Sequence, residues 1–257
     1  MSKLSTPALR IATYNVHGCV GTDRRRSERR IAEVIAETRA DIVGLQELDL
    51  KQRRSGGVDQ TGFIAKQLGW HSCFYPAIRN GDEQYGNAVL SRYPLTLRRG
   101  AELPGGAPFF CRESRAALLV EAETELGRIQ IINTHFGLGA RERLRAAQLL
   151  MSQSWLGAIG ADTPLILLGD LNCLPGSPPY RTFSEQHLRD VRTLVEPTTS
   201  LRTFFPTLLP MLAVDHIFVN ATLRPLSVVV HRTPLARIAS DHFPLVVELT
   251  RSGSPNE

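Results

Sequence analysis

The sequence predicts an α/β protein whose core contains two β-sheets with helices on their outer faces. Strand-like apolar segments outnumber helical segments along the 257 residues, and no linker, repeat or low-complexity tract divides them. A chain of this length can bury a large core in one domain. We therefore expect a single domain over 1–257, with a frayed tail at about 251–257.

Eight short apolar segments predict strands, because each is bounded by polar or turn-forming residues. They are 9–14, 42–46, 88–91, 116–121, 129–134, 165–168, 216–219 and 245–250. Four segments predict helices, at about 26–39, 59–69, 141–157 and 178–184. In the first of these, Ile31, Val34, Ile35 and Thr38 share one face.

Composition restricts the compartment and the class of partner. The formal charge is +5 and the sequence pI is near 9.3, which favours a phosphate-bearing partner, although the arginines of "DRRRSERR" (23–30) fit a solvated helix face. Cys19, Cys73, Cys111 and Cys173 lack the spacing of a disulfide framework or a zinc site. The chain also lacks a signal-peptide core and a membrane-length apolar run. We expect a cytoplasmic monomer that does not insert stably into membranes.

The stretch "PLILLGDLNCLPGS" (164–177) joins a buried strand to two polar side chains. In an extended chain, residues i and i+2 leave on one face, so Asp170 and Asn172 would project together from the strand end. Ligands of open α/β sheets bind at such ends. The alternative is that both residues only form a turn before Pro175 and Gly176.

Polar side chains recur where the other predicted strands begin or end. Asn15 ends the first strand in "TYNVHG", Glu47 follows the second in "DIVGLQELD", and His135 closes "IINTH". Asp215 opens "DHIFV", whereas Asp241 and His242 directly precede the last strand. Since the ends of neighbouring strands converge in space, these residues predict one site.

The residue types indicate the chemistry of that site. Glu47 and Asn15 offer hard oxygen ligands for Mg²⁺ or Mn²⁺. His242 and His135 could each be oriented by a carboxylate, one by Asp170 and the other by Asp215, and the sequence leaves open which pairs with which. Two imidazoles, a metal and an Asn donor suit in-line attack of water on a phosphorus ester, with Asp170 aligning the water and Asn172 holding a nonbridging oxygen.

The motifs "TYNVHG", "LQELD", "GNAVLSRYP", "NTHFGL", "GDLN", "DHIFV" and "SDHFPLVVEL" occur in one order over nearly the whole chain. In order, spacing and residue type they resemble the endonuclease/exonuclease/phosphatase superfamily with the DNase I-like fold. The resemblance implies a four-layer α/β sandwich, with two central mixed sheets flanked by helices, and a divalent-metal hydrolase of phosphoesters.

The resemblance also implies residue roles. Asn15 and Glu47 would bind metal, with Asp241 supporting the metal or an imidazole. His242 would act as general base or phosphate-stabilising imidazole, paired with Asp170 or Asp215, while His135 would assist the leaving group and Asn172 would hold the phosphate.

Four further residues are assigned with alternatives. Arg115, in preference to Arg112, is expected to contact phosphate. Asn87 would face the substrate or cap the start of a strand. His17 and His216 are expected to be structural.

Three functions compete. The first is hydrolysis of a phosphodiester, in nucleic acid or in a small molecule. The second takes a phospholipid or sphingomyelin-like head group, because the apolar loop "TFFPTLLPML" (203–212) leads to Asp215; we expect this loop to be mostly packed. The third is an inactive binding module, which would predict erosion of the site residues.

Overall fold

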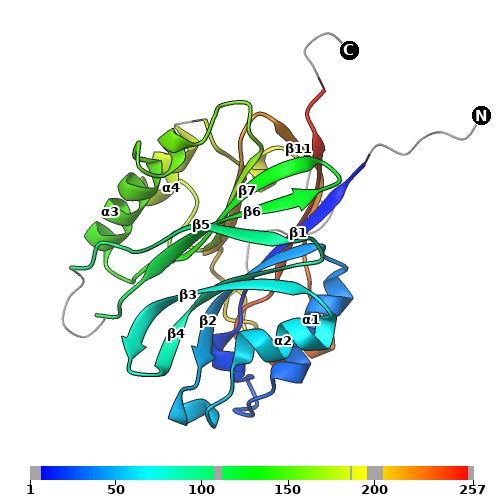
Figure 1. The fold of residues 1–257 in the computed structure, drawn as a ribbon, viewed down its shortest axis with the longest axis vertical. Coiled ribbons are helices and arrows are strands. Elements are labelled where there is room, and N and C mark those ends of the chain that lie inside the picture. The colour runs from blue at the N-terminus through cyan, green and yellow to red at the C-terminus, as the bar shows by residue number, and fades with distance from the viewer. Residues whose placement is uncertain (1–6, 107–111, 186, 196–204, 254–257) are drawn as a thin grey trace, which may run out of the picture.

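Two six-stranded mixed sheets face each other and form the centre of the molecule (Figure 1). The computed structural model describes residues 7–106, 112–185, 187–195 and 205–253. The first sheet contains, in spatial order, β11 (Leu223–Val230), β12 (Leu245–Arg251), β1 (Leu9–Asn15), β2 (Ile42–Leu50), β4 (Glu83–Ser91) and β3 (His71–Asn80). The second contains β5 (Leu95–Glu102), β6 (Ala116–Thr124), β7 (Gly127–His135), β8 (Leu165–Asp170), β10 (Asp215–Val219) and β9 (Arg189–Asp190).

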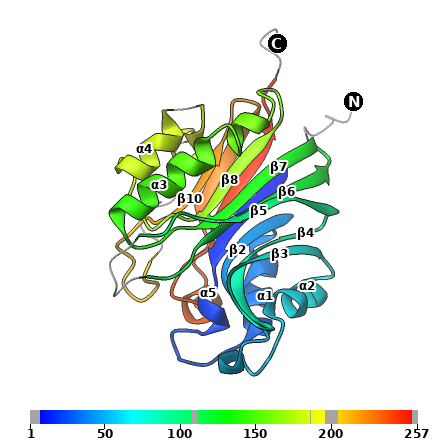
Figure 2. The ribbon, with the colours of Figure 1, turned by 60° about the vertical axis from the view of Figure 1, so that its left-hand side comes forward.

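Helices cover both outer faces, so the predicted four-layer sandwich is confirmed (Figure 2). The first sheet carries α1 (Glu28–Thr38), α2 (Gln60–Leu68) and α5 (Pro234–Ala239), and the second carries α3 (Ala140–Met151) and α4 (Pro178–Ser184). Ser27 caps α1 by accepting a hydrogen bond from the Arg30 amide, and Asp59 caps α2 in the same way through Gly62. The buried side chains of Ile31, Val34 and Ile35 attach α1 to the core.

The sequence prediction missed β3, β5, β9, β11 and α5, and extended α3 too far. The helix ends at Met151 instead of 157, because Ser152 leaves the helical conformation and its hydroxyl donates to the Leu149 carbonyl at 2.7 Å. A short 3₁₀ turn, Leu156–Ala158, follows. Within the expected tail, Arg251 still pairs with Leu223 in the sheet, whereas 254–257 lie outside the described residues.

A polar bridge joins the sheets close to the strand ends. The Asn133 side chain on β7 donates to the Leu45 and Ala88 carbonyls of the opposite sheet at 2.9 and 2.8 Å, and accepts from Gln46 at 2.7 Å. Gly44 has no space for a side chain, since a Cβ atom there would lie 2.1 Å from Leu168. Close approach of the sheets at this point aligns their ends.

Strand register brings the predicted site residues to one end of the sandwich. In the second sheet His135 lies beside Asp170, which lies beside Asp215. In the first sheet Asn15 lies beside Gln46, next to Glu47. The start of β1 and the end of β12 lie at the other end of the molecule (Figure 1). Among the described helices, none combines the length and apolarity needed to cross a membrane.

Candidate active site

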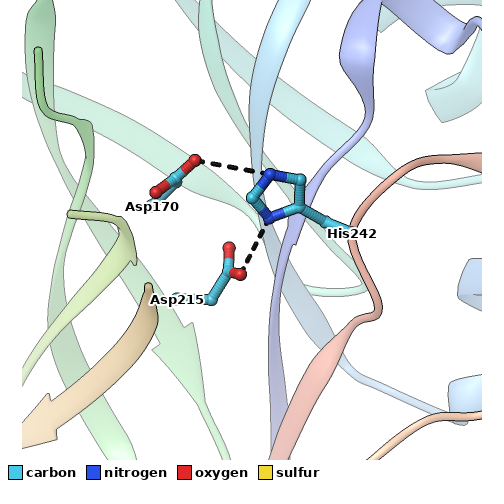
Figure 3. Close-up of side chains that lie close together, drawn as sticks. All are labelled: Asp170, Asp215 and His242. Carbon is cyan, nitrogen blue, oxygen red and sulfur yellow. Dashed lines mark hydrogen bonds and ion pairs between the residues drawn. The ribbon is translucent and has the colours of Figure 1, made fainter. Parts of the chain in front are cut away.

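Asp170, Asp215 and His242 form the centre of the site (Figure 3). Asp170 and Asp215 come from adjacent strands of the second sheet, and His242 comes from the segment before β12 in the first. All three are buried, and one potential ligand atom from each lies within 4.8 Å of the others. The site therefore spans the junction of the two sheets.

Asp170 both forms the turn and faces the other candidate site residues. Its Oδ1 accepts the Asn172 amide at 2.9 Å and so forms a turn. Its Oδ2 accepts from the Asn15 side chain at 3.0 Å and lies 3.5 Å from His135 Nε2 and 3.7 Å from His242 Nε2. Asn172 does not continue the strand as expected, because its φ of 46° places it in the left-handed conformation of this turn.

The structure pairs His242 with Asp215. His242 Nδ1 donates to Asp215 Oδ2 at 2.9 Å. Burial lowers the pKa of His242, but the charge and hydrogen bond of Asp215 outweigh burial and raise it to about 10. The Ser240 hydroxyl positions the segment by accepting the His242 amide and donating to the Asn15 carbonyl at 2.8 Å. His242 is therefore an imidazolium in this arrangement.

His135 has the opposite electrostatic environment. Burial, and then the charges of Arg115 and His242, hold its pKa well below the usual value. Arg115 Nη1 lies 3.0 Å from His135 Nδ1, and a guanidinium can only donate, so Nδ1 accepts. The neutral ring then carries its proton on Nε2, which lies 3.5 Å from the acceptor Asp170 Oδ2. Asn172 Nδ2 also lies 3.1 Å from this nitrogen, and it donates to the Phe136 carbonyl at 2.8 Å.

Glu47 and Asn15 lie beside this centre. Glu47 adopts a φ of 64° where β2 departs from its register with β4, and this bulge directs its side chain toward Asn15. Asn15 Nδ2 donates to Glu47 at 2.8 Å, while Asn15 Oδ1 accepts the His17 amide at 3.0 Å. Asn15 thus turns its amide nitrogen, not its oxygen, toward the carboxylates.

The donor set fits a hard divalent cation. Glu47, Asp170 and Asp215 supply carboxylate oxygens, and the buried Oδ1 of Asp215 has no hydrogen-bond partner in the described structure. Oxygen donors of this kind suit Mg²⁺ or Mn²⁺ better than softer metals. A buried carboxylate oxygen without a hydrogen-bond donor, beside further carboxylates, is a position that a cation would stabilise.

The remaining predicted residues lie around the centre. Asp241 is partly exposed and lies 3.5 Å from His17 Nδ1, and Arg115 pairs with Glu113 at 2.8 Å. The Asn87 side chain is buried and donates to the Ala116 carbonyl at 2.9 Å, a bond between the sheets.

The two histidines expected to be structural differ. His216 is buried between Asp190, at 3.2 Å, and the Cys173 carbonyl, at 2.8 Å, as a structural role requires. Burial first, and then the charge of Arg192, lowers its pKa. The His17 side chain is about half exposed, so it does not fill the core.

The loop before Asp215 corrects the expectation that it is packed. Phe205 stacks on the imidazole of His242 with ring centres 4.6 Å apart, but Leu208 and Leu209 are 68% and 65% exposed. Phe204 lies outside the described residues. The apolar composition predicted that the side chains of this loop are buried. Instead, Phe205 packs against His242 at one end of the loop, and the leucines beyond it are exposed. The contacts of Phe205 and Ser240 with the site were not predicted, because no local motif marks them.

Comparisons with known proteins agree with this architecture. The model of the Endonuclease/Exonuclease/phosphatase family matches residues 12–242. The uncharacterized protein YbhP of Escherichia coli K12 is 28% identical, over 94% of this chain and 96% of YbhP.

Solved structures share the fold at lower identity. An endonuclease/exonuclease/phosphatase of Beutenbergia cavernae has a TM-score of 0.75 and 22% identity, covering 97% of this chain and 73% of that one. A mannosyl-6-phosphatase of Bacteroides thetaiotaomicron has a TM-score of 0.72 and 22% identity, covering 94% of this chain and 99% of that one.

Replacing Asp215 should lower the pKa of His242. Because the Asp215 charge and hydrogen bond are the largest causes that raise this pKa, Asp215→Asn should shift it down by about one unit or more in chelator-treated protein. NMR titration of the imidazole measures the shift. Asp241→Asn is the control, since Asp241 contributes less, and an equal or larger shift in that variant would contradict the pairing.

Proposed function

This chain belongs to the endonuclease/exonuclease/phosphatase family, and we propose that it is a Mg²⁺- or Mn²⁺-dependent hydrolase of phosphodiester bonds. The observation that carries the proposal is the buried His242–Asp215 pair beside Asp170, with a neutral His135 on the other side of Asp170. Around the Asp170 carboxylate, these residues supply a cationic hydrogen-bond donor in His242, a proton acceptor in Asp170 itself and a neutral imidazole in His135. The presence of every predicted site residue argues against an inactive binding module.

In this proposal Glu47 and Asn15 hold the cation. Asn15 would turn its amide so that its oxygen replaces the nitrogen that now faces Glu47. Asp241, at the partly exposed edge of the site, would add negative charge. When bound, the cation would polarise the phosphate oxygens and neutralise part of the carboxylate charge.

Asp170 would align the attacking water and take its proton. Burial, opposed by the charge of His242 and reinforced by that of Asp215, raises the pKa of Asp170 to about 6. Asp170 is then mostly ionised at neutral pH, but it accepts a proton more readily than an ordinary carboxylate. As the water oxygen bonds to phosphorus, the P–O bond to the leaving group breaks.

The remaining residues would stabilise charge and assist departure. The His242 imidazolium would donate to a phosphate oxygen as negative charge develops there. Arg115 and Asn172, which both lie next to His135, would hold a nonbridging oxygen. His135, neutral with its proton on Nε2, would donate a hydrogen bond to the leaving oxygen and so stabilise the charge that develops there.

A chelator should abolish hydrolysis of bis(p-nitrophenyl) phosphate, and Mg²⁺ or Mn²⁺ should restore it. Glu47→Gln should raise the metal concentration required for half-maximal rate by about tenfold or more, because it removes an anionic ligand. The matched control is Glu123→Gln, a change at an exposed carboxylate of a distant strand end, which should need no extra metal. Full activity in excess chelator would contradict the assignment.

His242→Ala and His135→Ala should each lower kcat by about 10²- to 10⁴-fold with little change in melting temperature. If the residues act in one step, the double variant should lose less than the product of the single losses. His71→Ala is the control, because His71 is exposed at the start of β3 and lies beside Ser91, at the end of the first sheet that is opposite the site. Unfolding that matches the loss of activity would make these imidazoles structural instead.

A further inference from the structure

Exposed apolar side chains gather on the three loops that carry site residues. Among the described residues, ten large apolar side chains are exposed, and six of them belong to these loops. They are Leu138, Leu174, Leu208, Leu209, Met211 and Leu212, which we call the apolar rim. Leu138 follows His135, Leu174 follows Asn172, and the other four precede Asp215. Each rim residue therefore lies within about seven residues of a site residue.

The loop that carries four rim residues is fixed at its base. Phe205 exchanges backbone hydrogen bonds with Leu212, and the Thr207 amide donates to the Asp241 carbonyl at 2.8 Å. Phe205 also stacks on His242. These contacts hold the loop against the site, while Leu208, Leu209 and Met211 remain 63–68% exposed. These three side chains are therefore not part of the hydrophobic core.

Arginines flank the rim. Beside Leu138 and Leu174, Arg141 and Arg143 line a hollow of about 410 Å³ that reaches Asn172. On the other flank, Arg237 of α5 donates to the Thr207 carbonyl at 3.0 Å.

The flank beyond α5 is also basic. The Thr22 amide donates to the Ile238 carbonyl at 3.0 Å, so the 21–26 loop packs on α5 with Arg24 and Arg25 exposed. Asp23, in the same loop, pairs with Arg30 of α1. This single carboxylate does not neutralise both Arg24 and Arg25.

We propose that the apolar rim and its arginines dock on an anionic phospholipid surface, and that the substrate is a phosphodiester in that surface. This inference rests on the proposed function. Leucine and methionine side chains would enter the acyl-chain boundary, and the arginines would contact lipid phosphates. The scissile phosphate would then reach the His242–Asp170 centre from the surface that the rim contacts.

A nucleic-acid substrate fits these observations less well. Arginines alone would suit a phosphate backbone, but the rim is aliphatic, and single strands are held by stacking on aromatic rings. Aliphatic side chains exposed together gain most from contact with hydrocarbon.

Vesicle sedimentation tests the proposal. The chelator-treated protein should sediment with vesicles of phosphatidylcholine and phosphatidylglycerol at 3:1, and less with phosphatidylcholine alone. Leu208→Ser combined with Leu209→Ser should weaken binding by about tenfold or more. The matched control is Leu97→Ser combined with Leu226→Ser, a change at exposed leucines on β5 and β11 that should retain binding. Melting temperatures verify that each variant is folded.

Charge variants and competitors complete the experiment. Arg24→Gln combined with Arg25→Gln should weaken binding and reduce its dependence on salt. The proposal would be overturned if the wild type did not sediment or if the rim variant bound vesicles as well as the wild type. It would also be overturned if duplex DNA displaced the protein from vesicles, or if the wild type formed a dimer that dissociated in the rim variant. Hydrolysis of bis(p-nitrophenyl) phosphate and of the vesicle lipids is measured separately. Activity on the soluble diester without vesicle binding overturns only the lipid proposal. Rim-dependent binding without hydrolysis of either substrate supports the rim and contradicts the hydrolase.

Discussion

Burial of the Asp170 carboxylate between the two sheets is the constraint on which the site depends. An isolated buried charge costs several kcal/mol, so it persists only with compensating partners. These partners come from different parts of the chain. Asn15 belongs to the first sheet and the Asn172 amide to the turn after β8, whereas the imidazoles of His135 and His242 come from β7 and from the segment before β12. The Asn133 bridge and the close contact at Gly44 bring the sheets near enough for all of them to reach one carboxylate.

Two histidines on either side of this carboxylate acquire opposite properties from their neighbours. Burial lowers the pKa of both, but His242 faces Asp215 and becomes more basic, whereas His135 faces Arg115 and becomes less basic. The difference would let one imidazole act as a fixed cation and the other as a neutral hydrogen-bond donor at the same pH. Since the two rings approach the same Asp170 oxygen, a single phosphate could contact both.

Much of this arrangement could be predicted from the sequence, for identifiable reasons. Apolar runs that end in Gly169 or Asn15 mark central strands, and the polar residues after them predicted which side chains lie together in the candidate site. Strand β5 was missed because its partly exposed residues give no continuous apolar run. The apolar residues of β3 and β11 are interrupted by Pro76 and Pro225, which argue against a strand, and the six residues of α5 are too few to show a period. The pairing of His242 with Asp215 and the exposure of the 205–212 loop depend on how distant segments meet, which no local pattern encodes.

The most direct test of the central claim is the activity and melting temperature of Asp170→Asn. Asparagine keeps the size of the side chain and an oxygen that accepts the Asn172 amide, but it removes the buried negative charge. If Asp170 aligns water and accepts its proton, kcat on bis(p-nitrophenyl) phosphate should fall by about 10²-fold or more. The melting temperature should fall only moderately, because the new amide nitrogen faces the Asn15 donor whereas His242 keeps Asp215 as its partner. Wild-type activity in Asp170→Asn would show that this carboxylate serves only the turn, and would contradict the account.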